Sequence, residues 1–228
     1  MSNENKVVKI SPSLMCANPK KLFKQIEELH NAKVDYLHFD IMDGRFVPNK
    51  GLEPSIYAYV SKTSDIPIEL HLLVNFPEKY IGSLSLRKKD IFIFHYESKS
   101  KFNIFDLIKK AKKQSNVGIA INPGTMINKV YPYLSTLNTI LIMGVQPGFR
   151  GLQLIKGTHK KIKTLLNIKN KLKLTSLDIE IDGGVNFHTL KRLARMELDK
   201  IVCGKVLFDT GQDVEKSVAN LRKILLEV

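Results

Sequence analysis

The chain of 228 residues contains no tryptophan and only two cysteines, Cys16 and Cys203. Neither cysteine has the spacing of a metal site, so the sequence gives no basis for a disulfide framework or a cysteine-based zinc centre. It also lacks the run of about 18 apolar residues that crosses a bilayer, and its opening residues are too polar for a secretory signal. We therefore predict a soluble, cytoplasmic protein with no membrane partner.

Acidic side chains are in the minority, and the formal net charge is +14. The lysines are scattered in pairs such as Lys109-Lys110 and Lys160-Lys161, a pattern typical of solvated helix faces. A groove for single-stranded nucleic acid would interleave aromatic rings among its charges, and most phenylalanines here lie in apolar strands. We expect no nucleic-acid partner.

No linker rich in proline, glycine and serine divides the chain, so we interpret residues 1–228 as a single domain. Short β-rich runs alternate with segments that carry apolar residues at helical spacing, and we expect a helix after every strand. The predicted strands span residues 7–13, 35–41, 68–74, 91–96, 117–121, 139–145, 177–181 and 200–203.

Eight such repeats are typical of a closed (β/α)8 TIM barrel, although a doubly wound open sheet would give a similar pattern. Asp178, Glu180 and Asp182 share one face of the seventh strand, which is easier to accommodate inside a barrel than between layers of helices. We predict an α/β fold consisting of one TIM barrel, with its active site at the C-terminal ends of the strands.

Potential metal ligands stand at three of these strand ends. His38 and Asp40 alternate with apolar residues and so face the same side of their strand, while His71 and Asp182 end two others. Each residue alone has an ordinary structural explanation, but two buried carboxylates without a cation would carry a heavy desolvation cost. Two imidazoles and two carboxylates suit zinc, iron(II), manganese or cobalt.

Glycine-rich loops follow the sixth, seventh and eighth strands. One glycine pair is an ordinary turn, but three such loops at neighbouring strand ends predict a phosphate site, because glycine lets backbone N–H groups approach an anion closely. The glycines are Gly148, Gly151, Gly183, Gly184 and Gly204.

Several motifs, in order along nearly the whole chain, resemble the ribulose-phosphate 3-epimerase family. They are SPSL at 11–14, LHFDIMDGRFVPN at 37–49, ELHL at 69–72, PGF at 147–149 and DGGV at 182–185. The resemblance implies a barrel of the ribulose-phosphate-binding type and an isomerase of the pentose phosphate pathway that interconverts D-ribulose 5-phosphate and D-xylulose 5-phosphate. It also implies a homo-oligomer.

Carried over residue by residue, the resemblance implies one divalent metal ion, with zinc favoured, on His38, Asp40, His71 and Asp182. Asp40 and Asp182 would also form the acid–base pair. The residues that would contact substrate are Ser13, Met42 and Met143, with Gly148, Gly151, Gly183, Gly184 and Gly204 around the phosphate.

This assignment agrees with the chemistry. Inverting the carbon next to a ketone requires one group to remove a proton from one face and another to return a proton to the opposite face. The enediolate formed between these steps is negatively charged, and a metal bound to its oxygens would stabilise it.

The chain departs from the family pattern at a few positions. Leu73 replaces a frequent methionine, and Arg150 and Leu152 replace a glycine and a glutamine. Lys205 stands where the family usually has a serine beside the phosphate, and its ammonium either contacts the phosphate or turns to solvent. Residues 44–51 are long for a loop between a strand and a helix, and we predict that they close over the substrate.

Three alternative functions are compatible with parts of this pattern. An epimerase for a phosphorylated hexulose such as allulose 6-phosphate would use the same residues in a roomier pocket. A decarboxylase similar to the orotidine monophosphate decarboxylase group would carry DxKxxD, but this strand reads HxDxxD and has no lysine. A non-catalytic binding module would be signalled by loss of Asp40 or Asp182, and both are present.

Overall fold

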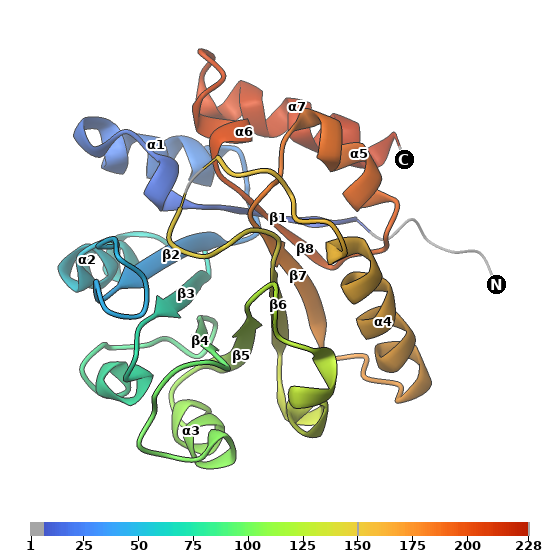
Figure 1. The fold of residues 1–228 in the computed structure, drawn as a ribbon. Helices are drawn as coiled ribbons and strands as arrows, with labels where there is room; N and C mark the ends of the chain where they lie inside the picture. Colours follow the sequence, from blue (N-terminus) through green and yellow to red (C-terminus); the bar gives the residue numbers. More distant parts are fainter. Residues whose placement is uncertain (1–6, 150, 228) are drawn as a thin grey trace.

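The structure, a computed structural model, describes residues 7–149 and 151–227. Eight parallel strands form a nearly closed barrel with the helices outside it (Figure 1). They pair in the order β1-β8-β7-β6-β5-β4-β3-β2, and a bridge between Ser13 and His38 joins the two end strands. The predicted TIM barrel is confirmed. The strands are β1 (Lys9–Pro12), β2 (Leu37–Met42), β3 (Ile68–Leu73), β4 (Ile91–His95), β5 (Asn116–Ile121), β6 (Thr139–Met143), β7 (Asp178–Asp182) and β8 (Lys200–Cys203).

Seven α-helices are seen in the described ranges: α1 (Leu22–Asn31), α2 (Pro54–Thr63), α3 (Ile104–Ala111), α4 (Thr158–Lys171), α5 (Phe187–Ala194), α6 (Lys205–Phe208) and α7 (Val214–Leu226). Short 3₁₀ turns η1 (Leu14–Cys16) and η2 (Pro19–Lys21) precede α1. None of the helices in these ranges has the length and apolar composition to cross a bilayer.

The expectation of a helix after every strand is wrong after β3 and β5. The chain there forms only the 3₁₀ turns η3 (Pro77–Tyr80), η4 (Ile127–Lys129) and η5 (Tyr131–Thr136). Proline lies in the first turn of η3 and of η5, where it allows a turn to start but limits backbone hydrogen bonding. Ile127, Val130 and Leu134 are nevertheless buried at helical spacing, which explains why the pattern predicted a helix.

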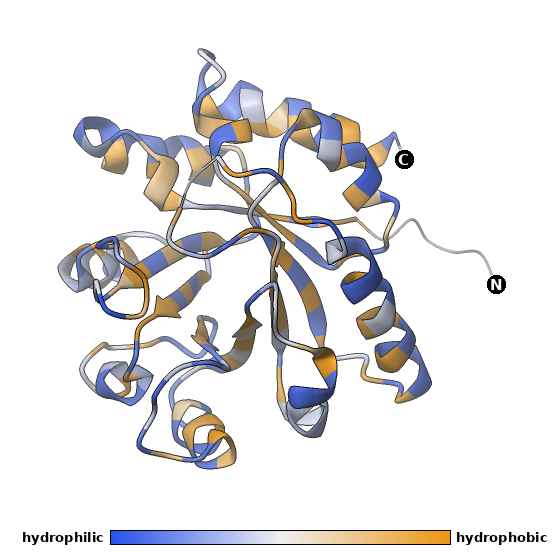
Figure 2. Ribbon diagram, viewed as in Figure 1, coloured by the Kyte–Doolittle hydropathy of each residue, from blue (hydrophilic) through white to orange (hydrophobic). Residues whose placement is uncertain are grey.

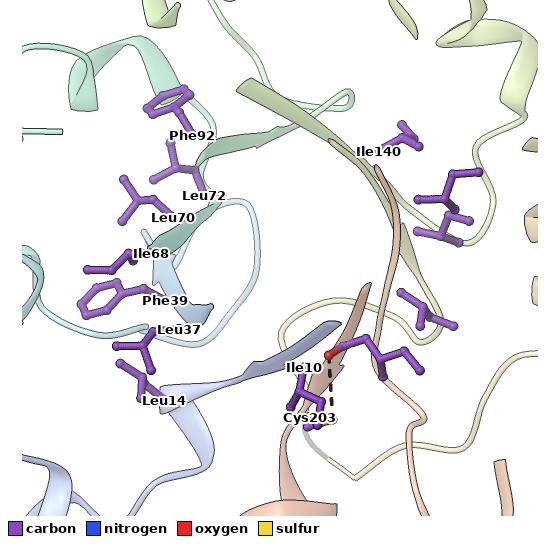
Figure 3. Close-up of a cluster of buried hydrophobic side chains, with 14 of the residues drawn as sticks. Ile10, Leu14, Leu37, Phe39, Ile68, Leu70, Leu72, Phe92, Ile140 and Cys203 are labelled. Atoms are coloured by element: carbon purple, nitrogen blue, oxygen red, sulfur yellow. Dashed lines mark hydrogen bonds between the residues drawn. The ribbon is translucent and has the colours of Figure 1, made fainter. Parts of the chain in front are cut away.

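Apolar and polar side chains alternate along β2, so the apolar residues face the core and the potential metal ligands face the other side of the strand. Leu37, Phe39 and Ile41 belong to the apolar cluster between strands and helices, and the ring of Phe39 packs against Tyr57 of α2 at 6.0 Å between centroids. Figure 3 shows Leu37 and Phe39 outside the ring of strands, and the strands in Figure 2 are banded by hydropathy. His38 and Asp40 therefore project into the barrel.

A fully buried lysine holds together the polar layer deep inside the barrel. Lys200 Nζ donates to Glu69 Oε1 at 2.5 Å and to Thr139 Oγ1 at 2.8 Å, and it lies 3.4 Å from Glu180 Oε2. The Ser11 hydroxyl also donates to Glu69. The prediction that Glu180 faces the barrel interior is confirmed.

The charges of this layer balance internally. Burial alone would lower the pKa of Lys200, but Glu180 and then Glu69 raise it above its usual range. Burial raises the pKa of Glu180, and the nearby Glu69 carboxylate adds to the rise. Burial would raise the pKa of Glu69 too, but Lys200 holds it below the usual range. These shifts favour an ion pair between Lys200 and Glu69 and favour the protonated form of Glu180.

Replacing Lys200 with methionine would leave the buried Glu69 carboxylate without its ammonium partner. We expect Lys200→Met to lower the free energy of unfolding by about 3–5 kcal/mol, measured by urea denaturation of the metal-free protein. The control is Lys9→Met, which breaks a half-exposed pair with Asp178 and should cost less than about 1 kcal/mol. Equal stabilities of the two variants would contradict this account.

Candidate active site

The predicted site residues meet at the C-terminal end of the barrel, around a cavity of about 630 Å³. The loop between β6 and α4, yellow in Figure 1, crosses this end and contributes Gly148 and Gly151 to the cavity wall. His38 and His71 are fully buried beside Asp40. The predicted residues that line the cavity are Ser13, Asp40, Met42, Met143, Gly148, Gly151, Asp182, Gly183, Gly184, Gly204 and Lys205.

Four potential ligands from three strands converge at one point. His38 and Asp40 lie on β2, His71 is the register partner of Asp40 on β3, and Asp182 ends β7. Nδ1 of His71 lies 2.9 Å from Asp40 Oδ1, 3.1 Å from His38 Nε2 and 3.8 Å from Asp182 Oδ2. Each residue offers one donor atom, and all four atoms lie within 4.8 Å of one another.

This donor set fits a divalent first-row metal ion. Such ions bind imidazole nitrogen and carboxylate oxygen at about 2.0–2.2 Å, so ligand atoms around one ion are separated by roughly 3–4 Å. The separations around His71 Nδ1 match this spacing, and so does the 3.3 Å between His38 Nε2 and Asp40 Oδ1. His38, Asp40, His71 and Asp182 are therefore the residues that would hold the ion.

The two carboxylates of this cluster have opposite electrostatic environments. Burial alone would raise the pKa of Asp40, but the charge and hydrogen bond of His38, followed by those of His71, hold it well below its usual range. Burial raises the pKa of Asp182 to about 6; His38 opposes this rise, and the facing Asp40 carboxylate adds to it. Without a metal, Asp40 is ionised at acid pH while Asp182 keeps its proton.

The imidazoles differ as well. Burial would lower the pKa of His38, but Asp40, Glu69 and Asp182 together raise it well above its usual range. Burial lowers the pKa of His71, and the charge on His38 contributes to that lowering. The metal-free cluster therefore uses the imidazolium of His38 as its internal cation.

Ser13 orients the second oxygen of Asp40. The Ser13 hydroxyl donates to Asp40 Oδ2 at 2.9 Å, while Oδ1 of the same carboxylate faces the two imidazoles. The backbone N–H of Ser13 donates to the Cys203 carbonyl at 3.0 Å, which ties the end of β1 to β8. Asp40 is thereby held in one rotamer with an oxygen at the cavity wall.

Glycine is required where the loop after β7 crosses the β6–α4 loop. Gly184 has a φ of 73°, and a Cβ placed there would lie 2.7 Å from the Leu154 Cα. A Cβ on Gly204 would lie 2.8 Å from Cys16 Sγ. Gly184 and Gly204 also line the cavity, so backbone forms its wall at these two points, which is the property that an anion site requires.

Lys205 lies at the rim of the cavity. A Cβ on Gly151 would meet the Lys205 ammonium at 3.1 Å, so the lysine extends along this loop. Its side chain is 56% exposed, and Nζ lies 4.0 Å from Asp209 Oδ2. The Lys205 ammonium is therefore free to turn towards an anion in the cavity, because its ion pair with Asp209 is long and exposed. Arg150, in the same loop, lies outside the described residues.

Residues 44–51 connect the metal cluster to the glycine loops. Asp43 accepts hydrogen bonds from the backbone N–H groups of Arg45, Phe46 and Asn75, and so it shapes the turn that opens this segment. Asn49 donates to the Gly148 carbonyl, and Asn49 and Lys50 line the cavity. This segment therefore reaches across to the β6–α4 loop, where a lid over the cavity would be attached.

Two residues near the cluster were missed by the sequence analysis. His95 ends β4 and is fully buried, with Nε2 2.9 Å from His71 Nε2, and Glu97 follows two residues later. The signal was present, because His95 follows Ile91 and Ile93 at the same alternating spacing that placed His38 and His71 inside the barrel.

Comparisons with known proteins agree in one family. A family model described as the ribulose-phosphate 3 epimerase family matches residues 9–208. The ribulose-phosphate 3-epimerase of Methanocaldococcus jannaschii is 32% identical, with 97% of this chain and 92% of that protein covered. The enzyme of the same name from Bacillus subtilis is 29% identical, with coverage of 95% and 99%.

Solved structures share the fold at much lower identity. KGPDC from Streptococcus mutans superposes with a TM-score of 0.67 at 10% identity, covering 97% of this chain and 99% of that one. A 3-hexulose-6-phosphate synthase gives a TM-score of 0.65 at 10% identity, with 95% and 99% covered. These structures show the barrel alone.

Metal binding should displace protons from the site, because His38 and Asp182 hold protons in the metal-free protein and ligands must be deprotonated. At pH 5.5, we expect the calorimetric enthalpy of zinc binding to change with the ionisation enthalpy of the buffer. Fewer protons should be released as the pH rises through about 6, where Asp182 has already ionised. Identical enthalpies in all buffers would contradict this assignment.

Proposed function

The chain belongs to the ribulose-phosphate 3-epimerase family, and we propose that it interconverts D-ribulose 5-phosphate and D-xylulose 5-phosphate by moving the proton at C3. The observation that carries this proposal is the placement of two carboxylates with different proton affinities at one cavity. Asp40 is held ionised and Asp182 has a pKa of about 6. Below about pH 6 the pair therefore offers an ionised base and a protonated acid, and above that pH Asp182 still takes up a proton more readily than Asp40 does.

The origin of the two aspartates on different strands supports proton transfer on opposite sides of the substrate. Asp40 projects from β2 and Asp182 from β7, and β1 and β8 lie between these strands around the barrel. One carboxylate takes the C3 proton and the other carboxyl group returns a proton to the opposite face, which inverts the carbon. After the reaction the first group is protonated and the second is ionised. The reverse reaction uses the same groups in the opposite order.

A divalent ion on His38, Asp40, His71 and Asp182 would offset the negative charge that develops on the substrate oxygens. Ser13 keeps Asp40 oriented by its hydrogen bond to Oδ2. The Met42, Leu73 and Met143 side chains line the cavity and supply an apolar surface, which keeps water away from the deprotonated substrate.

The phosphate end of the substrate would lie at the glycine loops. The backbone around the cavity is left uncovered at Gly148, Gly151, Gly183, Gly184 and Gly204. The described residues that line the cavity include two lysines, Lys50 and Lys205. Residues 44–51 would close over this end, held to Gly148 by Asn49. We propose that Lys205 contacts the phosphate.

The decisive experiment is a coupled epimerase assay with D-ribulose 5-phosphate on the metal-loaded protein. We expect turnover, and we expect Asp40→Asn and Asp182→Asn each to lower kcat by about 10²- to 10⁴-fold, since each removes one proton-transfer group. Asp178→Asn is the matched control, because Asp178 lies at the opposite end of β7 and should leave kcat unchanged. A folded, metal-loaded protein without turnover overturns the proposal, and preference for allulose 6-phosphate would assign it to the hexulose reaction.

The role of Lys205 has a separate test. If its ammonium binds the phosphate, Lys205→Ser should raise KM about tenfold and weaken the dependence of KM on salt, because a charge-assisted hydrogen bond is lost. The control Lys216→Ser removes an exposed lysine on α7 and should change neither quantity. If KM and its salt dependence are unchanged in Lys205→Ser, the lysine faces solvent.

A further inference from the structure

We propose that His95 and Glu97 form a buried hydrogen-bonded chain that fixes which nitrogen of His71 carries the proton, and so prepares His71 as a metal ligand. The inference rests on the metal site of the proposed function and concerns positioning residues rather than ligands. Neither His95 nor Glu97 belongs to the four-residue donor cluster. His95 contacts the cluster through His71, and Glu97 contacts His95 on the side away from the cluster.

The contact between the two histidines demands one donor and one acceptor. Nε2 of His71 lies 2.9 Å from Nε2 of His95, and the ring planes are inclined by 24°. Both rings are fully buried. A neutral imidazole has one N–H and one bare nitrogen, so at this distance one of the two Nε2 atoms carries a proton and the other accepts it.

The direction of this hydrogen bond follows from the inner nitrogen of His71. Its Nδ1 is the atom that points into the donor cluster, 2.9 Å from Asp40 Oδ1. A ligating nitrogen must be bare, so the proton of His71 is on Nε2 and is donated to His95. His95 Nε2 is then the acceptor, and the proton of His95 is on Nδ1.

Glu97 completes the chain. Its Oε2 lies 3.3 Å from His95 Nδ1 and accepts that proton. Its other oxygen, Oε1, accepts from the backbone N–H of Asn122 at 2.9 Å and from the Thr125 hydroxyl. A carboxylate is the right group here, because it accepts at both oxygens and offers no proton to His95.

The backbone N–H of Asn122 makes Glu97→Gln an informative substitution. That N–H can only donate, so the glutamine carbonyl should turn towards Asn122 and its NH₂ towards His95. The NH₂ would force His95 Nδ1 to become the acceptor and move the His95 proton to Nε2. His71 Nε2 would then have to accept, leaving its proton on Nδ1, the ligating atom.

A purely structural role for this pair predicts a different result. Glutamine has nearly the shape of glutamate, so packing around His95 would be preserved and metal binding would be little changed. A matched control is Thr125→Val, which removes one hydrogen bond to Oε1 but leaves the carboxylate facing His95. It should leave the tautomer of both histidines unchanged.

The experiment measures the zinc dissociation constant of the full chain by competition with a chromophoric chelator. We expect Glu97→Gln to weaken zinc binding about 10- to 100-fold, and Thr125→Val to change it less than threefold. Histidine ¹⁵N spectra of the zinc-loaded wild-type protein should show the proton of His71 on Nε2 and that of His95 on Nδ1. His95→Phe, which keeps a ring against Phe46, should weaken zinc binding at least tenfold if Glu97→Gln fails to fold.

The outcomes separate this inference from the proposed function. Wild-type protein that binds no zinc would overturn the metal site and this inference together. Two results would overturn only the role of His95 and Glu97. In the first, the wild-type protein binds zinc, and Glu97→Gln or His95→Phe changes the zinc affinity less than threefold. In the second, the wild-type spectra show the opposite tautomers.

Discussion

Compensation of buried charge is the constraint on which the interior of this barrel depends. Carboxylates from β2, β3 and β7 project into the barrel, where burial removes most of their contact with solvent, and an isolated carboxylate there would be strongly destabilising. The molecule meets this constraint at two depths. Lys200 neutralises Glu69 deep in the barrel, and at the mouth the imidazoles of His38 and His71 lie against Asp40 and Asp182, where these four residues could also hold a metal ion.

The two depths are connected through the histidines of the donor cluster. Nδ1 of His38 lies 3.5 Å from Glu69 Oε2, so the ring that offers Nε2 to the donor cluster also touches the carboxylate held by Lys200. His71 is supported on its outer side by His95 and Glu97. Each imidazole is therefore oriented by a carboxylate that is not itself in the donor cluster, either directly or through a second ring.

The sequence was sufficient to predict the strands and the convergence of His38, Asp40, His71 and Asp182, because alternation along a strand is a local property. Lys200 and Glu69 are 131 positions apart in the sequence. Their pairing depends on how the strands are aligned around the barrel, and no local sequence pattern encodes that alignment. His95 followed the same alternation but lies outside the motifs that carry the family resemblance, and Glu97 lies beyond the strand end. The helix predicted after β5 failed because burial at helical spacing is also achieved by 3₁₀ turns, and after β3 a single 3₁₀ turn starting at Pro77 takes the place of the helix.

The lysine inside the barrel would make the folding of this protein independent of any metal ion at the mouth. A cation attached to the backbone cannot be chelated or exchanged, so the strands around Lys200 keep their charge balance whatever the surroundings provide. At the mouth, the imidazolium of His38 balances Asp40 before any ion arrives. The charges inside the barrel are therefore paired by the chain's own residues, and an ion at the mouth would be free to bind or leave without the scaffold being rebuilt.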